Sequence, residues 1–236
     1  MSDPREDSRG GSLAGLLVVS IEQAVAAPLC TVRLADGGAR VIKIERTEGE
    51  TARHYDSSVE GVSAYFVWLN RGKESAALDL KGKEDLALLH RLIAKADIFV
   101  QNLAPGAIDR LGLSRAALVE KFPRLISAHI VGYGQDTPYA DMRAYDMLVQ
   151  AESGVCAVMG SPDTPSKIAV SAADIATGMN AHAAALDPLR IAAHSFARPP
   201  GRAQAHRRDH PFDLDTISCG IRGLRQIRED KPGADL

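Results

Sequence analysis

Hydrophobic residues along the chain alternate between short β-branched runs and stretches with helical spacing. The runs predict buried strands over 16–21, 40–45, 74–80, 97–102 and 124–134. The stretches predict helices over 27–38, 82–96, 106–112 and 115–122. Strands that alternate with helices of this length favour a mostly parallel sheet covered by helices on both faces. The pattern therefore predicts an α/β protein with a Rossmann-like large domain.

This alternation stops at both ends of the chain. Residues 1–12 carry charge, serine and glycine with almost nothing apolar, which predicts a mobile tail. Residues 187–236 are rich in arginine, histidine and proline and show neither strand alternation nor a sustained helical stripe. A tail that binds nucleic acid or a partner is one interpretation, but the basic residues are not interleaved with an aromatic platform, so a poorly folded segment is favoured. We expect residues 13–186 to form the folded domain.

Composition narrows the class of protein. With 236 residues and 45% hydrophobic content, the chain can bury one sizeable core. A net charge of −2 gives no argument for nucleic acid or an anionic membrane, and no apolar run is long enough to span a bilayer. Neither a dinucleotide fingerprint nor a P-loop is present. We expect a cytoplasmic protein that binds neither nucleic acid nor membrane.

The three cysteines, Cys30, Cys156 and Cys219, are far apart in the sequence and have no metal-binding spacing. They are expected to be free thiols in a reducing compartment, and no histidine adds a persuasive metal geometry. No metal site is predicted.

One acid stands out by its surroundings. Asp174 lies in a run of small and apolar residues, 168–186. A buried carboxylate is costly unless it is hydrogen-bonded or paired, so it either caps a helix or takes part in chemistry. Asp174 or Ser171 could begin a helix that continues through Ile175, and the residues alone favour this capping role.

Four stretches together carry a family resemblance. They are APLCTVRLADGGARVIKIER (27–46), NRGKESAALDLK (70–81), ADIFVQNLAPGAIDRLGL (96–113) and YDMLVQAESG (145–154). In this order and spacing they resemble the class III CoA-transferases, which include the formyl-CoA:oxalate, carnitine and bile-acid CoA-transferases. The resemblance implies an enzyme that moves CoA from an acyl-CoA donor to a small free carboxylic acid.

The resemblance also implies a catalytic residue. In the family, an aspartate attacks the donor thioester, and an aspartyl-CoA thioester then carries CoA to the acceptor acid. The stretch ADIATGM places Asp174 at the position of this nucleophile. Asp146 is either a second acid of the active site or a structural hydrogen-bonding residue.

Coenzyme A is a substrate in this chemistry, and no tightly bound cofactor or metal is implied. Its phosphates require cations and backbone donors. Similarity to the family's CoA site implies contacts from nine residues, with Leu103 and Ala104 acting through their backbone. These residues are Val25, Ala26, Arg46, Lys81, Asn102, Leu103, Ala104, Arg110 and Arg143.

The chain is shorter than the family leads one to expect. The family's second, smaller domain is not recognisable, so we interpret the chain as a truncated member. The family forms an interlocked homodimer that uses segments of that domain, and we expect this dimer to be compromised here. Two alternatives stay open: an α-methylacyl-CoA racemase, which would need a histidine opposite the aspartate, and a non-catalytic CoA-binding or dimerising remnant.

Overall fold

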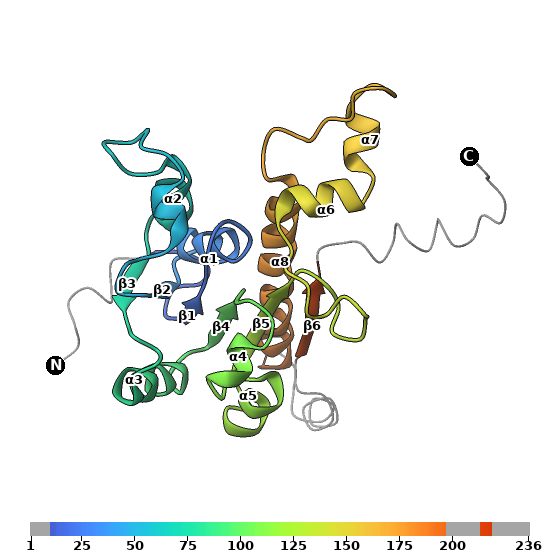
Figure 1. Cartoon of the computed structure of the whole chain (residues 1–236). Coiled ribbons are helices and arrows are strands. Elements are labelled where there is room, and N and C mark those ends of the chain that lie inside the picture. The colour runs from blue at the N-terminus through green and yellow to red at the C-terminus, as the bar shows by residue number, and fades with distance from the viewer. Residues whose placement is uncertain (1–9, 197–212, 219–236) are drawn as a thin grey trace.

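The computed structural model describes residues 10–196 and 213–218 (Figure 1). Its centre is a six-stranded sheet in the order β3-β2-β1-β4-β5-β6, in which every neighbouring pair is parallel. The strands are β1 (Leu17–Ile21), β2 (Arg40–Glu45), β3 (Glu74–Ala77), β4 (Ile98–Gln101), β5 (Ile126–Val131) and β6 (Asp213–Ser218). The predicted Rossmann-like α/β fold is confirmed.

Helices connect the strands. They are α1 (Ala26–Asp36), α2 (Ala64–Asn70), α3 (Lys83–Ile93), α4 (Ala107–Arg110), α5 (Arg115–Lys121), α6 (Asp146–Glu152), α7 (Val155–Met159) and α8 (Ala172–Phe196), with a 3-10 helix, η1 (Thr51–His54). Within the described ranges, no helix is both long and apolar enough to cross a membrane.

The core has two layers, one on each face of the sheet (Figure 1). Successive strand residues point to opposite faces, so Val18 packs in the layer with α1 and α8, whereas Val19 packs in the layer with α3, α4 and α5. Both valines are fully buried. This explains why the strands read as continuous apolar runs in the sequence.

The helices α1 and α8 approach each other at a glycine of α8. A Cβ added at Gly178 would lie 2.5 Å from the carbonyl oxygen of Ala26 and 2.9 Å from Cβ of Leu29. Only a residue without a side chain fits there. The contact fixes the beginning of α1 against the first turns of α8.

The direction in which strands are added to the sheet reverses between β1 and β4. At such a switch point the loops that follow the two strands separate and leave a crevice at their carboxyl ends. Here the loops are tied together, because Asn102 Oδ1 accepts from the backbone N–H of Gln23 at 2.9 Å and Asn102 Nδ2 donates to its carbonyl oxygen at 2.8 Å.

The C-terminal part of the described chain differs from the expectation of a poorly folded tail. Helix α8 continues past the expected boundary at Leu186, and β6 pairs with β5 through Ala128 and Leu214. A strand at this position covers the edge that β5 would otherwise expose. The sequence pattern missed it because Leu214 and Ile217 are the strand's only apolar residues.

The expectation for residues 1–12 falls mostly on residues outside the described ranges, as does the rest of 187–236. Gly11 is described, and a Cβ there would lie 2.3 Å from the carbonyl oxygen of Gly37. The chain therefore already packs against the end of α1 before β1 begins.

Candidate active site

Two acids from different helices meet at the N-terminus of α8. Asp146, the first residue of α6, accepts the backbone N–H of Ala173 at 2.8 Å and that of Asp174 at 3.3 Å, both with Oδ1. Its Oδ2 accepts from Gln150 Nε2 at 2.7 Å. The helix begins at Ala172, directly after Ser171, and Asp174 lies in its first turn, as the local sequence predicted. The side chain that accepts from its first amides is that of Asp146, which the sequence did not indicate as a cap.

The carboxylate of Asp174 is left available for chemistry. It is half-buried and accepts no hydrogen bond from any part of the chain that the structure describes. Burial raises its pKa to about 6, and the charge of Asp146 adds to this effect. Asp174 is therefore ionised at neutral pH but more basic than an ordinary aspartate, which favours a nucleophilic role.

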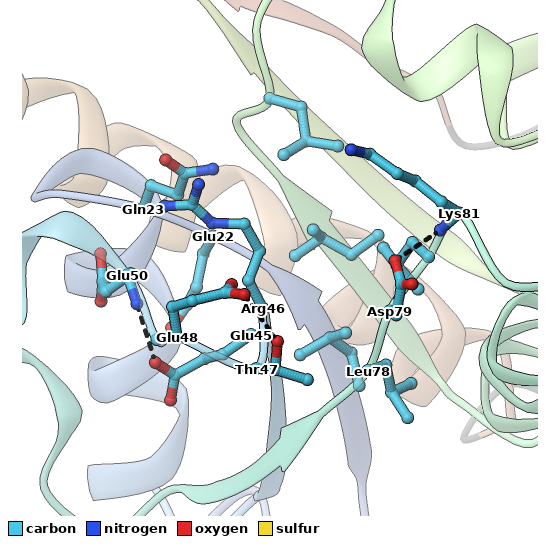
Figure 2. Close-up of a pocket in the computed structure, with 15 residues that line it drawn as sticks. Glu22, Gln23, Glu45, Arg46, Thr47, Glu48, Glu50, Leu78, Asp79 and Lys81 are labelled. Carbon is cyan, nitrogen blue, oxygen red and sulfur yellow. Dashed lines mark hydrogen bonds between the residues drawn. The ribbon is translucent and has the colours of Figure 1, made fainter.

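A pocket of about 580 Å³ lies at the carboxyl ends of the first three strands (Figure 2). Arg46 follows β2 and Lys81 follows β3, and both line it together with Leu103 from the loop after β4. Three of the residues expected to bind CoA are thus brought together. Two cations of this kind suit an anionic ligand such as a phosphate.

Acidic residues also line this pocket, but three of them form ion pairs with lysine or arginine side chains. Glu22 pairs with Lys73, with 2.6 Å between Oε1 and Nζ, and Glu45 pairs with Arg53, with 2.7 Å between Oε1 and Nη2. Glu50 pairs with Lys43. The carboxylates of these three acids are almost completely buried. The negative charges of these three acids are therefore compensated and would repel an anionic ligand less.

The pKa values of two of these acids reflect their pairing. Burial alone would raise the pKa of Glu45, but hydrogen bonds from Arg53 and Ser75 outweigh it and lower the pKa to about 2. Burial likewise opposes ionisation of Glu22, and the charges of Lys73 and Lys43 overcome it, so its pKa is also lowered. Pairing with cations therefore favours the ionised form of both acids, although both are buried.

The remaining residues expected at the CoA site lie elsewhere. Val25 and Ala26 are buried at the start of α1, and Ala104 is exposed beyond β4. Arg110 at the end of α4 and Arg143 in the loop before α6 are exposed and do not line the pocket. Asp174 does not line this pocket either.

Sequence reasoning missed the buried charges beneath the pocket. Lys43 and Glu45 interrupt an otherwise apolar strand, RVIKIE, and are at most 6% exposed. Charged residues that must be buried with their strand need partners, so this interruption was the signal that could have revealed the cluster.

The two histidines nearest in context to a racemase base, His129 and His182, have hydrogen-bond partners other than Asp174 in the described part of the chain. His182 is eight residues further along α8, or about 12 Å, and its Nδ1 accepts from Arg33 Nε at 3.3 Å. His129 lies in β5, bonds Gln101 at 3.0 Å and packs on Phe99. Burial lowers the pKa of His129 to about 4.

Cys30 and Cys156 are free thiols, as expected, whereas Cys219 lies outside the described ranges. Burial raises the pKa of Cys30 to about 12, so this thiol is unreactive. Across residues 10–196 and 213–218, no group of three or more potential ligands could hold a metal ion.

The parallel strand order, which reverses between β1 and β4, and the helices on both faces of the sheet define a doubly wound, Rossmann-like α/β protein. The family model "CoA-transferase family III" matches residues 13–195, and the chain belongs to this family.

Curated relatives carry transferase names. The chain is 43% identical over 156 residues to an acetyl-CoA:oxalate CoA-transferase of Acetobacter aceti. The aligned region covers 66% of this chain and 40% of that protein. It is 38% identical over 181 residues to a succinate–glutarate CoA-transferase of Agrobacterium fabrum. Here the aligned region covers 73% of this chain and 45% of that protein. The chain thus spans less than half the length of these relatives.

A solved structure shares the fold. A CAIB/BAIF family protein from Brucella suis superimposes with a TM-score of 0.75 at 32% identity, over 96% of this chain and 60% of that protein. The family and the fold implied by the sequence are both confirmed.

Proposed function

We propose that this chain carries the nucleophile and the CoA-binding pocket of an enzyme that transfers CoA from an acyl-CoA to a small carboxylic acid. The observation that carries this proposal is Asp174, a half-buried carboxylate without a hydrogen bond in the described chain, whose pKa is raised to about 6. Membership of CoA-transferase family III and the transferase names of the relatives support it.

The first half-reaction loads CoA onto the protein. The Asp174 carboxylate attacks the thioester carbonyl, the C–S bond breaks, and a mixed anhydride and CoA thiolate result. The thiolate then attacks the aspartyl carbonyl of the anhydride. This releases the donor as a free carboxylate and leaves an aspartyl-CoA thioester, so the energy of the thioester is conserved.

The second half-reaction repeats these steps in reverse with another acid. The acceptor carboxylate attacks the aspartyl thioester and displaces CoA thiolate, which then attacks the acceptor's carbonyl. The new acyl-CoA leaves and the Asp174 carboxylate is regenerated. No net proton transfer is needed, because a carboxylate enters and a carboxylate leaves.

The protein's contribution is to orient and stabilise these groups. Asp174 sits in the first turn of a 25-residue helix, where the dipole favours negative charge. Arg46 and Lys81 are proposed to hold phosphates of CoA in the pocket. The other predicted contacts, which include Asn102, Arg110 and Arg143, stay predictions for the bound state.

We further propose a cytoplasmic reaction, in line with the absence of a membrane-spanning helix from the described ranges. The family homodimer was expected to be compromised in this chain, and it stays a prediction that light scattering at several protein concentrations tests. A discrete dimer that persists on dilution would contradict it.

The transfer reaction tests the proposal. Succinyl-CoA is incubated with the protein and a panel of small carboxylic acids, and each new acyl-CoA is detected by mass spectrometry. We expect at least one acid to become a CoA ester with the wild-type chain and none with Asp174→Asn. Binding of CoA without any turnover would favour the non-catalytic alternative.

A further inference from the structure

A buried cluster of four charges lies next to the pocket, and the transfer chemistry does not use it. It consists of Glu22, Glu50, Lys43 and Lys73, whose side chains are at most 2% exposed. Two acids and two cations balance one another. Ion pairs buried this deeply are weak evidence for stability, because hydrophobic residues of the same volume would serve as well. The cluster therefore needs another explanation.

Glu50 uses its two carboxylate oxygens for different partners. Oε1 pairs with the ammonium of Lys43, which also donates to Asn70 Oδ1 at 2.8 Å. Oε2 accepts the backbone N–H of Ala24 at 2.8 Å. Glu50 thus connects the charge cluster to the loop between β1 and α1.

Ala24 has a backbone conformation that alanine avoids. Its φ is +60°, in the left-handed region where a Cβ is unfavourable. Such a conformation persists only where the surroundings impose it. The bond from Ala24 to Glu50 is one such constraint, and the two bonds between Gln23 and Asn102 hold the preceding residue.

The loop that is held in this way forms part of the proposed ligand site. Gln23 lines the pocket, Val25 follows Ala24 as the N-cap residue of α1, and the helix begins at Ala26. A change of φ at Ala24 would turn the path of the chain between the pocket and the helix. The conformation of Ala24 therefore determines the path of the loop from the pocket to the first turn of α1, which the contact at Gly178 holds on its other side.

We propose that Glu50 is a positioning residue that holds Ala24 in its left-handed conformation and so sets the β1–α1 loop for binding acyl-CoA. Lys43 balances its charge, which allows the carboxylate to stay buried in the required place. The identity of the ligand rests on the proposed function, whereas the control of Ala24 by Glu50 does not.

Two double variants separate this role from simple stability. Lys43→Met/Glu50→Gln and Lys43→Met/Glu50→Met each remove one acid and one cation, so neither leaves an unmatched buried charge. Glutamine keeps a carbonyl oxygen that can accept from Ala24, and methionine does not. Three quantities are measured: hydrogen exchange of the Ala24 amide without ligand, CoA affinity by calorimetry, and thermal unfolding.

We expect the Ala24 amide to exchange at least about tenfold faster in the methionine variant than in the glutamine variant, and its Kd for CoA to be higher by about tenfold. Both variants should unfold at similar temperatures. Adding Ala24→Gly to the methionine variant should restore part of the affinity, because glycine adopts positive φ without help.

Equal exchange rates in the two double variants would overturn the role of Glu50, whatever the affinities. Unequal exchange with equal affinities would overturn its link to ligand binding. If the wild-type chain itself binds no CoA, the proposed function fails, and the exchange rates still decide whether Glu50 controls Ala24.

Discussion

Asp146 accepts the backbone N–H of Asp174 at 3.3 Å, so the two acids share the N-terminus of α8 in different roles. Asp146 is hydrogen-bonded three times, to two backbone amides and to Gln150. It accepts from two backbone amides at the start of α8 that have no partner within the helix. Because Asp146 caps the helix, the carboxylate of Asp174 accepts no hydrogen bond in the described chain, and its pKa is raised.

The capping role of Asp146 predicts a loss of stability on truncation. Asp146→Ala removes the acceptor for two amides of α8 and should lower the free energy of unfolding by about 1 to 2 kcal/mol. Asp146→Asn keeps a carbonyl oxygen in place and should lose clearly less. Urea denaturation of both variants checks this, and equal losses would show that the charge matters rather than the cap.

The raised pKa of Asp174 predicts the pH dependence of stability. The native pKa is about 6, compared with an ordinary value of 3.8, so between these pH values the folded protein holds the proton more tightly than the unfolded chain. The contribution of Asp174 to stability therefore falls as pH rises from 4 to 6 and stays low above 6.

Asp174→Asn removes this titration. The variant should match the wild type at pH 4 and be more stable at pH 7.5 by about 1 to 2 kcal/mol, after allowance for partial solvation. Thermal unfolding at the two pH values measures the difference. A variant that is less stable than the wild type at pH 7.5 would mean that the Asp174 carboxylate is a structural group after all.

The pocket predicts which cations contribute most to CoA affinity. Arg46→Ala and Lys81→Ala should each weaken CoA binding by about tenfold or more, the usual effect of losing a charge-assisted hydrogen bond. Arg91→Ala, an exposed arginine on α3, is a matched control and should change little. Calorimetry measures the CoA affinity of all three variants. If Arg91→Ala binds CoA as weakly as the two pocket variants do, the pocket is not the CoA site.

Gly178 predicts a reversal of the usual effect of alanine in a helix. Glycine to alanine within a helix normally stabilises by about 0.5 to 1 kcal/mol. At Gly178 the new methyl group would collide with Ala26 and Leu29, so Gly178→Ala should destabilise by about 1 to 3 kcal/mol. Denaturation of Gly178→Ala measures whether its free energy of unfolding falls, and Asn180→Ala, at an exposed position on α8, is measured beside it for comparison.

Elements with a strong period were predictable from the sequence. β1, β2, β4, β5, α1 and α3 lie within one or two residues of the predicted ranges or inside them, because each buries a whole face or run. Helices α6 and α7 were not predicted, since their apolar residues, such as Met147 and Val158, are exposed in the described chain and give no clear stripe.

The candidate site was predictable only in part. Family resemblance indicated Asp174, Arg46 and Lys81, and the local sequence placed Asp174 at the start of a helix, but it did not indicate that the side chain of Asp146 caps that helix. The residue that caps α8 is 28 positions away in the chain, and the bond between Glu50 and Ala24 spans 26 positions. Contacts between such distant residues depend on how the strands assemble, which no local pattern reports.

The central claim is that Asp174 receives CoA, and intact-mass spectrometry after incubation with succinyl-CoA tests it most directly. We predict a protein adduct with the mass of CoA less one water, located at Asp174 by peptide mapping, labile to hydroxylamine and absent from Asp174→Asn. No adduct in a wild-type chain that binds CoA, or an unchanged adduct in Asp174→Asn, would contradict the account.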